Sequence, residues 1–422
     1  MRVLLLAEQC NPTHTSSPLK AYKYCAAIAN AAEDVWVATA LRNKSAIDQL
    51  GIGRAKPIYI DNEQSTKTSM KWRRFLRAGA DLGALLSLRR FSLFERDVYR
   101  SLEAELRAGQ FDIVNRITPT SSAIPSVFQN FVNVPFVLGP VNGGLTYPRH
   151  FRWTQIRELE ILRFLRSIHT ATPSYKRSIR SCSAILAGFS HTVNTLPKDC
   201  RDRIFEMPDM GADSRDFVYK QRIQRVKCRF VFVGRLIPFK CPTVAVHAFA
   251  QSKLLHQHEI VFVGDGPERS SIESVINKYG LHGSVTLMGN VAHTKVAQIM
   301  QDSDVFVFPS IRDAGAAVLA EAMMSGMPSI TVNYGPPESL LTDACGIRVP
   351  LGSFEDHVQS FRAAMEKLSV NPELRASMGH ASHQRASRIL DWDVKAKRIV
   401  QVYEWVLGRR KDKPDFYSEE PV

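Results

Sequence analysis

The sequence lacks the cysteine patterns of disulfide-rich and zinc-binding proteins. It contains seven cysteines, an odd number, and no two of them form a C-x-x-C pair. Scattered thiols of this kind are typical of a protein in a reducing compartment. They exclude a disulfide framework and a zinc site built on paired cysteines.

Long hydrophobic runs are also missing. No stretch approaches the ~18 apolar residues of a membrane-spanning helix, and the short apolar run at residues 1–7 ends at Glu8. That run is too short for the core of a signal peptide and suits a first buried strand better. We expect a cytoplasmic protein, for which a peripheral position on the inner face of the cytoplasmic membrane stays open.

Acidic residues are scarce in the first half of the chain, where basic residues clearly outnumber them. Residues 1–215 hold 30 Lys and Arg against 19 Asp and Glu, the rest holds 25 against 22, and the net charge over 422 residues is +14. A basic excess in one half indicates contact with nucleic acid, a membrane surface or a phosphorylated substrate, although a solvated basic surface would look the same. Because no recognised nucleic-acid-binding module appears, we expect no nucleic-acid partner.

Apolar, strand-like runs alternate with helical segments along the whole chain. They fall into two series, at residues 3–7, 35–40, 112–117, 135–139 and 184–187, and at 229–234, 259–264, 284–288, 304–308 and 329–332. This alternation predicts an α/β protein whose parallel sheets are covered by helices on both faces. A polar stretch at 208–228 separates the series and predicts a linker between two doubly wound domains. The charged last residues, 410–422, are expected to fray.

The most informative loop follows the strand-like run at 304–308. It holds Asp313 and Gly315, and the helical segment after it carries Glu321. A glycine at a helix start lets a phosphate approach the backbone N–H groups, and two acids eight residues apart can both reach a ligand along one wall. A capping aspartate and an ordinary surface glutamate would fit the same spacing.

Loops at other strand ends complete a predicted cleft, since ligands of such sheets bind at the carboxyl ends of the strands. Arg235 and Lys240 could neutralise a diphosphate without a metal, and Gly264 forms a tight turn after the next strand. A strand of the first half ends in an Asn-Gly-Gly turn, formed by Asn142, Gly143 and Gly144. Each of these loops also fits a plain solvated turn.

Together these loops resemble glycosyltransferase family 4, the retaining sugar-nucleotide-dependent enzymes of the GT-B fold. The block PSIRDAGAAVLAEAMMSGMPSI is similar to the family's E-x7-E signature, and FVGRLIPFK, FVGDGP, PFVLGPVNGGLTYP and WDVKAKRIVQVYEWVL are similar to further segments. The resemblance implies two Rossmann-like domains that face each other across a cleft. The acceptor domain would span 1–210 and the sugar-nucleotide donor domain 215–395, with a last helix at 392–408 crossing back to complete the first domain.

The resemblance also implies a function. It predicts a retaining, metal-independent hexosyltransferase that moves a sugar from a nucleotide diphosphate sugar to a glycan or lipid-linked acceptor, in cell-surface, exopolysaccharide or lipopolysaccharide synthesis. No metal or other cofactor is expected. Following the family pattern, the catalytic residues would be Asp313, Arg235 and Lys240. The donor would also be held by Gly264, Gly315 and Glu321, with Glu321 on the ribose, and the acceptor side of the cleft by Asn142, Gly143 and Gly144.

Three positions depart from the family pattern. Asp313 stands where most members have the first glutamate, Asn11-Pro12-Thr13 replaces a Gly-Gly loop, and Asn115 stands where a histidine is expected. The last two differences leave open the acceptor and any catalytic help from the first domain. The base and sugar of the donor, the linkage and the oligomeric state are open as well.

Two rival functions share this fold. One is a sugar-nucleotide 2-epimerase, and the other is a protein that binds a sugar nucleotide without turning it over. The pair Asp313 and Glu321, and a basic first half suited to a separate acceptor, favour transfer.

Residues 71–96 form a basic segment rich in aromatic residues. It holds seven Lys and Arg against two acids, together with Trp72, Phe75, Phe91 and Phe94. This mixture predicts a helical segment that lies on an anionic membrane surface. The alternative is a basic surface helix that packs on its own domain by the aromatic face.

Overall fold

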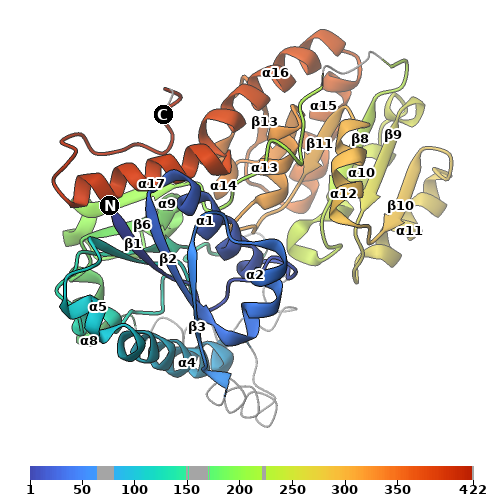
Figure 1. Ribbon diagram of the computed structural model, residues 1–422. Coiled ribbons are helices and arrows are strands. Elements are labelled where there is room, and N and C mark those ends of the chain that lie inside the picture. The colour runs from blue at the N-terminus through green and yellow to red at the C-terminus, as the bar shows by residue number, and fades with distance from the viewer. Residues whose placement is uncertain (64–79, 149–150, 152–169, 171, 221–224, 421–422) are drawn as a thin grey trace.

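The chain folds into two lobes, each built around a parallel sheet (Figure 1). The structure is a computed structural model that describes residues 1–63, 80–148, 151, 170, 172–220 and 225–420. The N-terminal lobe is blue to green in Figure 1, and the C-terminal lobe is yellow to orange. Within the described residues, no helix is both long enough and apolar enough to pass through a bilayer.

The N-terminal lobe contains a seven-stranded sheet in the order β3-β2-β1-β4-β5-β6-β7 among the described residues. Its strands are β1 (Arg2–Leu6), β2 (Asp34–Ala40), β3 (Lys56–Ile60), β4 (Ile113–Arg116), β5 (Phe136–Val141), β6 (Ala184–Gly188) and β7 (Ile204–Met207). Its helices are α1 (Ser17–Ala31), α2 (Lys44–Leu50), α4 (Ala80–Ser101), α5 (Glu103–Arg107), α8 (Pro173–Arg180) and α9 (Phe189–Val193). The central strands β1 and β4 are buried because helices cover both faces of the sheet, and most of their residues are apolar; Asn115 and Arg116 of β4 are buried polar residues.

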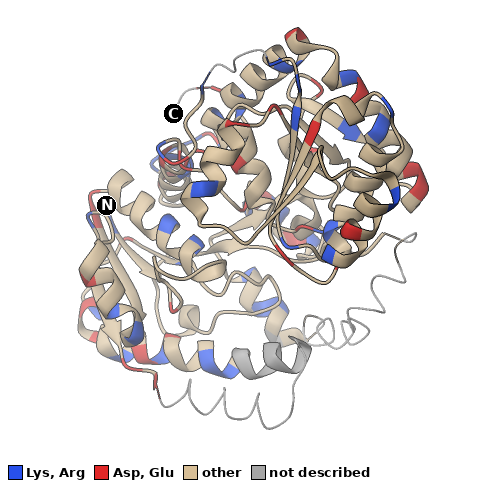
Figure 2. Cartoon of the chain, turned by 90° about the vertical axis from the view of Figure 1, so that its right-hand side faces the viewer, with Lys and Arg blue, Asp and Glu red and all other residues tan. Residues whose placement is uncertain are grey.

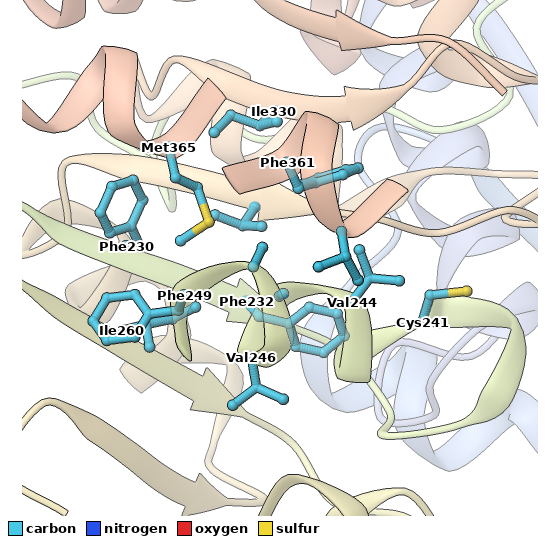
Figure 3. Close-up of a cluster of buried hydrophobic side chains, with 14 of the residues drawn as sticks. Phe230, Phe232, Cys241, Val244, Val246, Phe249, Ile260, Ile330, Phe361 and Met365 are labelled. Carbon is cyan, nitrogen blue, oxygen red and sulfur yellow. The ribbon is translucent and has the colours of Figure 1, made fainter. Parts of the chain in front are cut away.

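The C-terminal lobe contains a six-stranded sheet in the order β10-β9-β8-β11-β12-β13 among the described residues. Its strands are β8 (Arg229–Val233), β9 (Glu259–Val263), β10 (Val285–Gly289), β11 (Val305–Phe308), β12 (Ser329–Val332) and β13 (Gly346–Val349). Its helices are α10 (Pro242–Ala250), α11 (Arg269–Tyr279), α12 (His293–Gln301), α13 (Ala317–Met324), α14 (Pro336–Leu340), α15 (Phe354–Ser369) and α16 (Pro372–Ile389). Phe230 and Phe232 of β8 pack with Phe249 of α10 and Phe361 of α15 in one of its cores (Figure 3).

The last helix, α17 (Trp392–Val406), returns to the N-terminal lobe, as expected. It lies along the top of that lobe in Figure 1 and packs against α1. Its apolar face, with Trp392, Ile399 and Tyr403, is buried in the same core as β1 and β2. The chain therefore crosses between the lobes twice, near residues 208–213 and near residues 390–391.

The predicted fold class is confirmed by this architecture, and every predicted strand is present. Three strands were not predicted, and β3, β7 and β13 all lie at a sheet edge. An edge strand is paired on one side only, so it can be short and partly polar. Lys56–Ile60, for example, carries two exposed residues and a proline. Its sequence lacks the continuous apolar run that marked the interior strands.

The helix α4 corrects one expectation about the basic segment of residues 71–96. Phe91 and Phe94 are buried in the core of the N-terminal lobe, so they cannot enter a membrane. Arg90 pairs with the buried carboxylate of Glu8, at 3.1 Å between Nη2 and Oε2. Residues 71–79, with Trp72 and Phe75, lie outside the described residues. Among the described side chains of α4, those that are both charged and exposed, Arg89, Arg96 and Arg100, are basic.

The C-terminal tail corrects another expectation, because residues 410–420 are held in place and do not fray. Phe416 is fully buried in the core that contains α17. The Arg398 guanidinium donates to the carbonyl of Phe416 at 2.7 Å, and the Lys413 ammonium donates to the carbonyl of Asp202 at 2.8 Å. At its end, Glu419 pairs with Arg385 of α16.

Replacing Phe416 by alanine should therefore destabilise the protein by about 3 kcal/mol, as expected for a buried phenylalanine. The matched control is Phe354→Ala, because Phe354 is 40% exposed and should lose less than ~1 kcal/mol. Urea unfolding monitored by fluorescence measures both changes. Equal unfolding midpoints for the two variants would show that the tail contributes no buried core.

Candidate functional site

Two adjoining cavities lie between the lobes, at the carboxyl ends of the two sheets. Cavity A has a volume of about 650 Å³ and is lined by residues of both lobes, including Ser121, Gly144, Tyr175, Arg235, Lys240 and Asp313. Cavity B has a volume of about 400 Å³ and is lined by residues that include Ser17, Lys20, Asn142, Asp209, Gly315 and Ala316. Gly143, Asp313 and Ala314 line both cavities. The two cavities therefore form one continuous cleft.

The cationic wall of cavity A comes from the loop after β8. Arg235 is exposed there, and no partner of its side chain is found among the described residues. Lys240 lies at the end of a short 3-10 helix, η7 (Pro238–Lys240), and its Nζ is 2.7 Å from Oδ2 of Asp313. A Cβ atom at Gly234 would approach Cδ of Lys240 to 3.2 Å. The glycine therefore leaves room for the lysine to fold back along the strand end.

Asp313 has both of the roles that its sequence position allowed: it binds the backbone at the start of a helix, and it faces the cleft. Its Oδ1 accepts a hydrogen bond from the backbone N–H of Ala316 at 3.0 Å, just before α13. Its Oδ2 faces the cavity and pairs with Lys240. The same carboxylate thus fixes the loop and presents a charge to the cleft.

On the opposite wall, Asn142 links the two lobes. Its Nδ2 donates to the carbonyl of Ala314 at 2.7 Å and to Oδ2 of Asp209 at 2.8 Å. Its Oδ1 lies 3.2 Å from Nε2 of His191. Burial lowers the pKa of His191 to about 4, against the opposing effect of Asp209, so the imidazole is neutral near pH 7 and its Nε2–H donates.

Gly143 and Gly144 are required by packing as well as by the cavity. Gly144 has a φ of 84°, and a Cβ there would lie 2.3 Å from Cγ2 of Thr195. The backbone N–H of Gly143 donates to the hydroxyl of Thr192 at 3.1 Å. The turn is therefore fixed against α9 and the residues that follow it, and it still lines the cleft.

A buried ion pair below cavity B was not predicted. The ammonium of Lys20, on α1, lies 2.8 Å and 2.9 Å from the two carboxylate oxygens of Asp209, and both side chains are less than a tenth exposed. Burial opposes ionisation of Asp209, but Lys20 and the Asn142 amide outweigh it and hold the pKa of Asp209 below its usual value. Asp209 falls in the segment that the sequence identified only as a linker, and no local pattern marks its partner.

A second buried lysine supports the same junction. Lys395 of α17 donates to the hydroxyl of Tyr24 at 2.9 Å and to the carbonyl of Met210 at 2.8 Å. Burial drives the pKa of Lys395 well below its usual value, although Asp209 opposes this. The hydroxyl of Tyr24 in turn donates to the carbonyl of Asp209 at 2.7 Å.

Glu321 and Gly264 are not among the residues that line cavities A and B. Glu321 lies in the second turn of α13, where its Oε1 is 3.0 Å from Nε2 of His293 on α12. That hydrogen bond raises the pKa of His293 above its usual value, against the effect of burial. Gly264 is a packing glycine, since a Cβ there would lie 2.1 Å from the carbonyl oxygen of Gly234.

Asn115, which stands where the resemblance led us to expect a histidine, lies outside the cleft and is fully buried. Its Nδ2 donates to the carbonyls of Val137 and Gly139 at 3.1 Å and 2.7 Å, and its Oδ1 accepts from the hydroxyl of Tyr403 at 2.6 Å. Its place is structural: it joins β4 and β5 to α17. Within the described residues, no group of three or more His, Cys, Asp or Glu side chains could hold a metal ion.

Arg312 is a further residue of cavity A that the sequence did not single out. Its guanidinium lies 4.4 Å from the ring centroid of Tyr147, a residue of the N-terminal half that is buried in the core of the C-terminal lobe. Tyr175 and Thr195 also line this cavity. They come from segments without any strand-end motif, so only the fold brings them to the cleft.

The sequence of the C-terminal lobe is similar to a known family. Residues 215–385 match the model of the family described as "Glycosyl transferases group 1". These matched residues are called the group 1 domain below. Its first and last matched residues enclose β8 to β13, with Arg235, Lys240, Asp313 and Glu321.

A curated yeast protein is similar to less than half of this chain. The GPI3 subunit of phosphatidylinositol N-acetylglucosaminyltransferase from Saccharomyces cerevisiae is 26% identical over 185 residues, which cover 44% of this chain and 40% of the yeast protein. The match thus spans less than half the length of that relative.

Solved structures resemble the whole chain. A sucrose-phosphate synthase from Thermosynechococcus elongatus has a TM-score of 0.63 at 15% identity, covering 97% of this chain and 100% of that chain. Anabaena Alr3699/HepE in complex with UDP-glucose has a TM-score of 0.61 at 16% identity, again covering 97% and 100%. The fold around the group 1 domain is therefore GT-B, and the resemblance read from the sequence motifs to GT-B glycosyltransferases is confirmed.

Proposed function

We propose that this protein is a retaining, metal-independent glycosyltransferase. It transfers a hexosyl-type sugar from a nucleotide diphosphate sugar to a glycan or lipid-linked acceptor, in the synthesis of cell-surface polysaccharide. The observation that carries the proposal is the meeting of Lys240, Asp313 and Arg235 in cavity A, opposite the Asn-Gly-Gly turn of the other lobe. The names of the relatives point the same way, since one is an N-acetylglucosaminyltransferase of phosphatidylinositol and another was solved with UDP-glucose.

The donor diphosphate is held by protein cations in this proposal. Arg235 and Lys240 stabilise the negative charge that develops on the departing nucleoside diphosphate, which is electrostatic catalysis without a metal. In the structure the Lys240 ammonium is paired with the Asp313 carboxylate. A bound diphosphate replaces that carboxylate at the ammonium and leaves Asp313 to accept hydrogen bonds from the hydroxyls of the donor sugar.

Transfer then follows a front-face route. The bond from the anomeric carbon to the diphosphate oxygen breaks through an oxocarbenium-like state, and the acceptor oxygen attacks the same face. The acceptor proton passes to the leaving diphosphate, so no side-chain nucleophile is needed. Glu321, which lies outside cavities A and B and is hydrogen bonded to His293, accepts hydrogen bonds from the ribose of a donor whose nucleoside extends beyond cavity A.

A donor screen in EDTA tests the proposal. The purified protein is incubated with a panel of nucleoside diphosphates and their sugars. A ligand at ~100 times its dissociation constant should stabilise the fold by ~2.7 kcal/mol in a thermal-shift assay. Slow release of nucleoside diphosphate from the matching donor should persist in EDTA.

A new sugar nucleotide as product would instead indicate an epimerase. Binding of the donor without any product would indicate a protein that only binds it. Activity lost in EDTA and restored by Mg²⁺ or Mn²⁺ would contradict the metal-free mechanism.

Replacing Lys240 by alanine should weaken donor binding and turnover by roughly tenfold to a hundredfold, the value of one charged hydrogen bond. The Asp313 carboxylate then faces the diphosphate uncompensated, so Lys240→Ala combined with Asp313→Asn should bind nucleoside diphosphate better than Lys240→Ala alone. The control is Lys253→Ala, at an exposed lysine that lines neither cavity. Titration calorimetry measures all three variants. A Lys240→Ala variant that binds and turns over donor like the parent rules out this role.

We also propose peripheral membrane contact through the basic segment of residues 71–96 and the end of α4. The side chains of α4 that face the core include Phe91, Phe94 and Val98. The opposite face exposes Arg89, Arg96 and Arg100, on the helix at the lower edge of Figure 2. Near an anionic bilayer each cation that faces the surface can contribute ~1 kcal/mol.

The protein should therefore pellet with anionic vesicles at low salt and be released as the salt concentration rises. Changing Arg73, Arg74, Arg89 and Arg96 to Glu should abolish pelleting and leave nucleotide binding unchanged. Arg90 is left intact because it pairs with Glu8 in the core. If the parent protein does not pellet with anionic vesicles at low salt, the basic face of α4 is only a solvated surface.

A further inference from the structure

A third hollow, cavity C, adjoins cavity A on the wall formed by the N-terminal lobe. Its volume is about 470 Å³, and it shares Thr170, Tyr175 and Thr195 with cavity A. Its other walls come from α8 and from the start of a 3-10 helix, η6 (Lys198–Arg203). A molecule that entered cavity A from this side would pass over cavity C.

Most of the charged side chains that line cavity C are cationic. Lys176, Arg180 and Lys198 line it, against one acid, Asp199. The acid is already engaged, because its Oδ2 lies 2.6 Å from Nε of Arg180. Lys176 and Lys198 are exposed, and their ammonium groups have no partner among the described residues. Two unpaired ammonium groups beside a neutralised pair give the hollow a net positive charge.

Hydrogen bonds to the backbone hold two of the residues at the boundary between cavities A and C. The Tyr175 ring is buried, and its hydroxyl donates to the carbonyl of Ser122 at 2.6 Å. The Thr195 hydroxyl donates to the carbonyl of Thr192 at 2.7 Å. The two hollows therefore keep a fixed relation, in which a group in cavity C and a group in cavity A can belong to one molecule.

We propose that cavity C binds a phosphoryl group of the acceptor while the acceptor's sugar hydroxyl lies in cavity A. The inference rests on the proposed function. Arg235 and Lys240 are then occupied by the donor diphosphate, so an anionic acceptor needs separate cations on the other lobe. Lysine ammonium groups serve as point charges for phosphate. A soluble sugar phosphate and a lipid-linked sugar diphosphate share this chemistry.

The position of α8 agrees with either source. The Gln129 amide, in η2 (Phe128–Asn130), donates to the carbonyl of Ser178 on α8 at 2.6 Å. The Glu95 carboxylate of α4 accepts from the backbone N–H of Phe128 at 3.0 Å. Cavity C thus lies on the side of the sheet that α4 covers, where the basic face proposed to meet a membrane is exposed.

Binding of two probes tests the proposal. The background is Arg235→Ala with Lys240→Ala, which removes the donor cations, so the result does not depend on the donor site. The probes are glucose 1-phosphate in solution and polyprenyl diphosphate in neutral phosphatidylcholine vesicles, with glucose and polyprenol as uncharged controls. The test variant adds Lys176→Glu and Lys198→Glu. The control variant adds Lys253→Glu and Lys278→Glu, which change the net charge equally at exposed lysines of the other lobe.

At least one phosphorylated probe should bind, and the test pair should weaken it about tenfold while the control pair changes it less than about twofold. Binding of the polyprenyl diphosphate alone assigns a lipid-linked acceptor, and binding of glucose 1-phosphate alone assigns a soluble one. Absence of binding by both probes, or equal losses in the two variants, overturns the proposal. Retained nucleoside diphosphate binding by a chain with only the test pair shows that the fold and donor site are intact, so the two proposals can fail separately.

Discussion

The structure depends on one buried ion pair, Lys20 with Asp209. The two side chains come from α1 and from the segment that leaves the N-terminal lobe, and both are removed from water. Removing one partner of such a pair typically costs about 3–5 kcal/mol, because the other charge stays buried. The Asn142 amide satisfies a further lone pair of the carboxylate and reaches the carbonyl of Ala314. The charge at the lobe junction is thereby connected to the loop that carries Asp313.

This connection sets the shape of the cleft. Asn142 holds the Asn-Gly-Gly turn at the level of the Asp313 loop, and Tyr334 of the C-terminal lobe donates to the carbonyl of Thr146 at 2.7 Å on the outer side. The strand ends of the two sheets are therefore kept face to face, as doubly wound sheets require for a shared ligand. The residues proposed to act on the substrates lie in short loops at the strand ends. The contacts of Lys20, Asp209 and Asn142 at the lobe junction set the distance between these loops.

The interior strands and the loops of the group 1 domain could be predicted from the sequence because their signals are local. Arg235, Lys240 and Asp313 stand in loops that follow apolar strands, and the structure brings them to one cavity. Lys20 and Asp209 are 189 residues apart, so only the fold reveals their pairing. Composition also misjudged Phe91 and Phe94, because an aromatic residue among arginines suits a membrane and a core equally. Their three-residue spacing, read as one helix face with Val98, favours the core.

The two crossings between the lobes lie side by side, and this limits how the lobes can move. The backbone N–H of Ala212, on the first crossing, donates to the carbonyl of Leu390 beside the second at 3.0 Å. Two adjacent connections permit rotation about the line that runs through them and oppose sliding of one lobe past the other. We therefore expect any opening of the cleft to be a hinge motion about a nearly fixed axis. Its amplitude at the cavities grows with their distance from Ala212, so the loops farthest from this axis travel the most when a ligand enters or leaves.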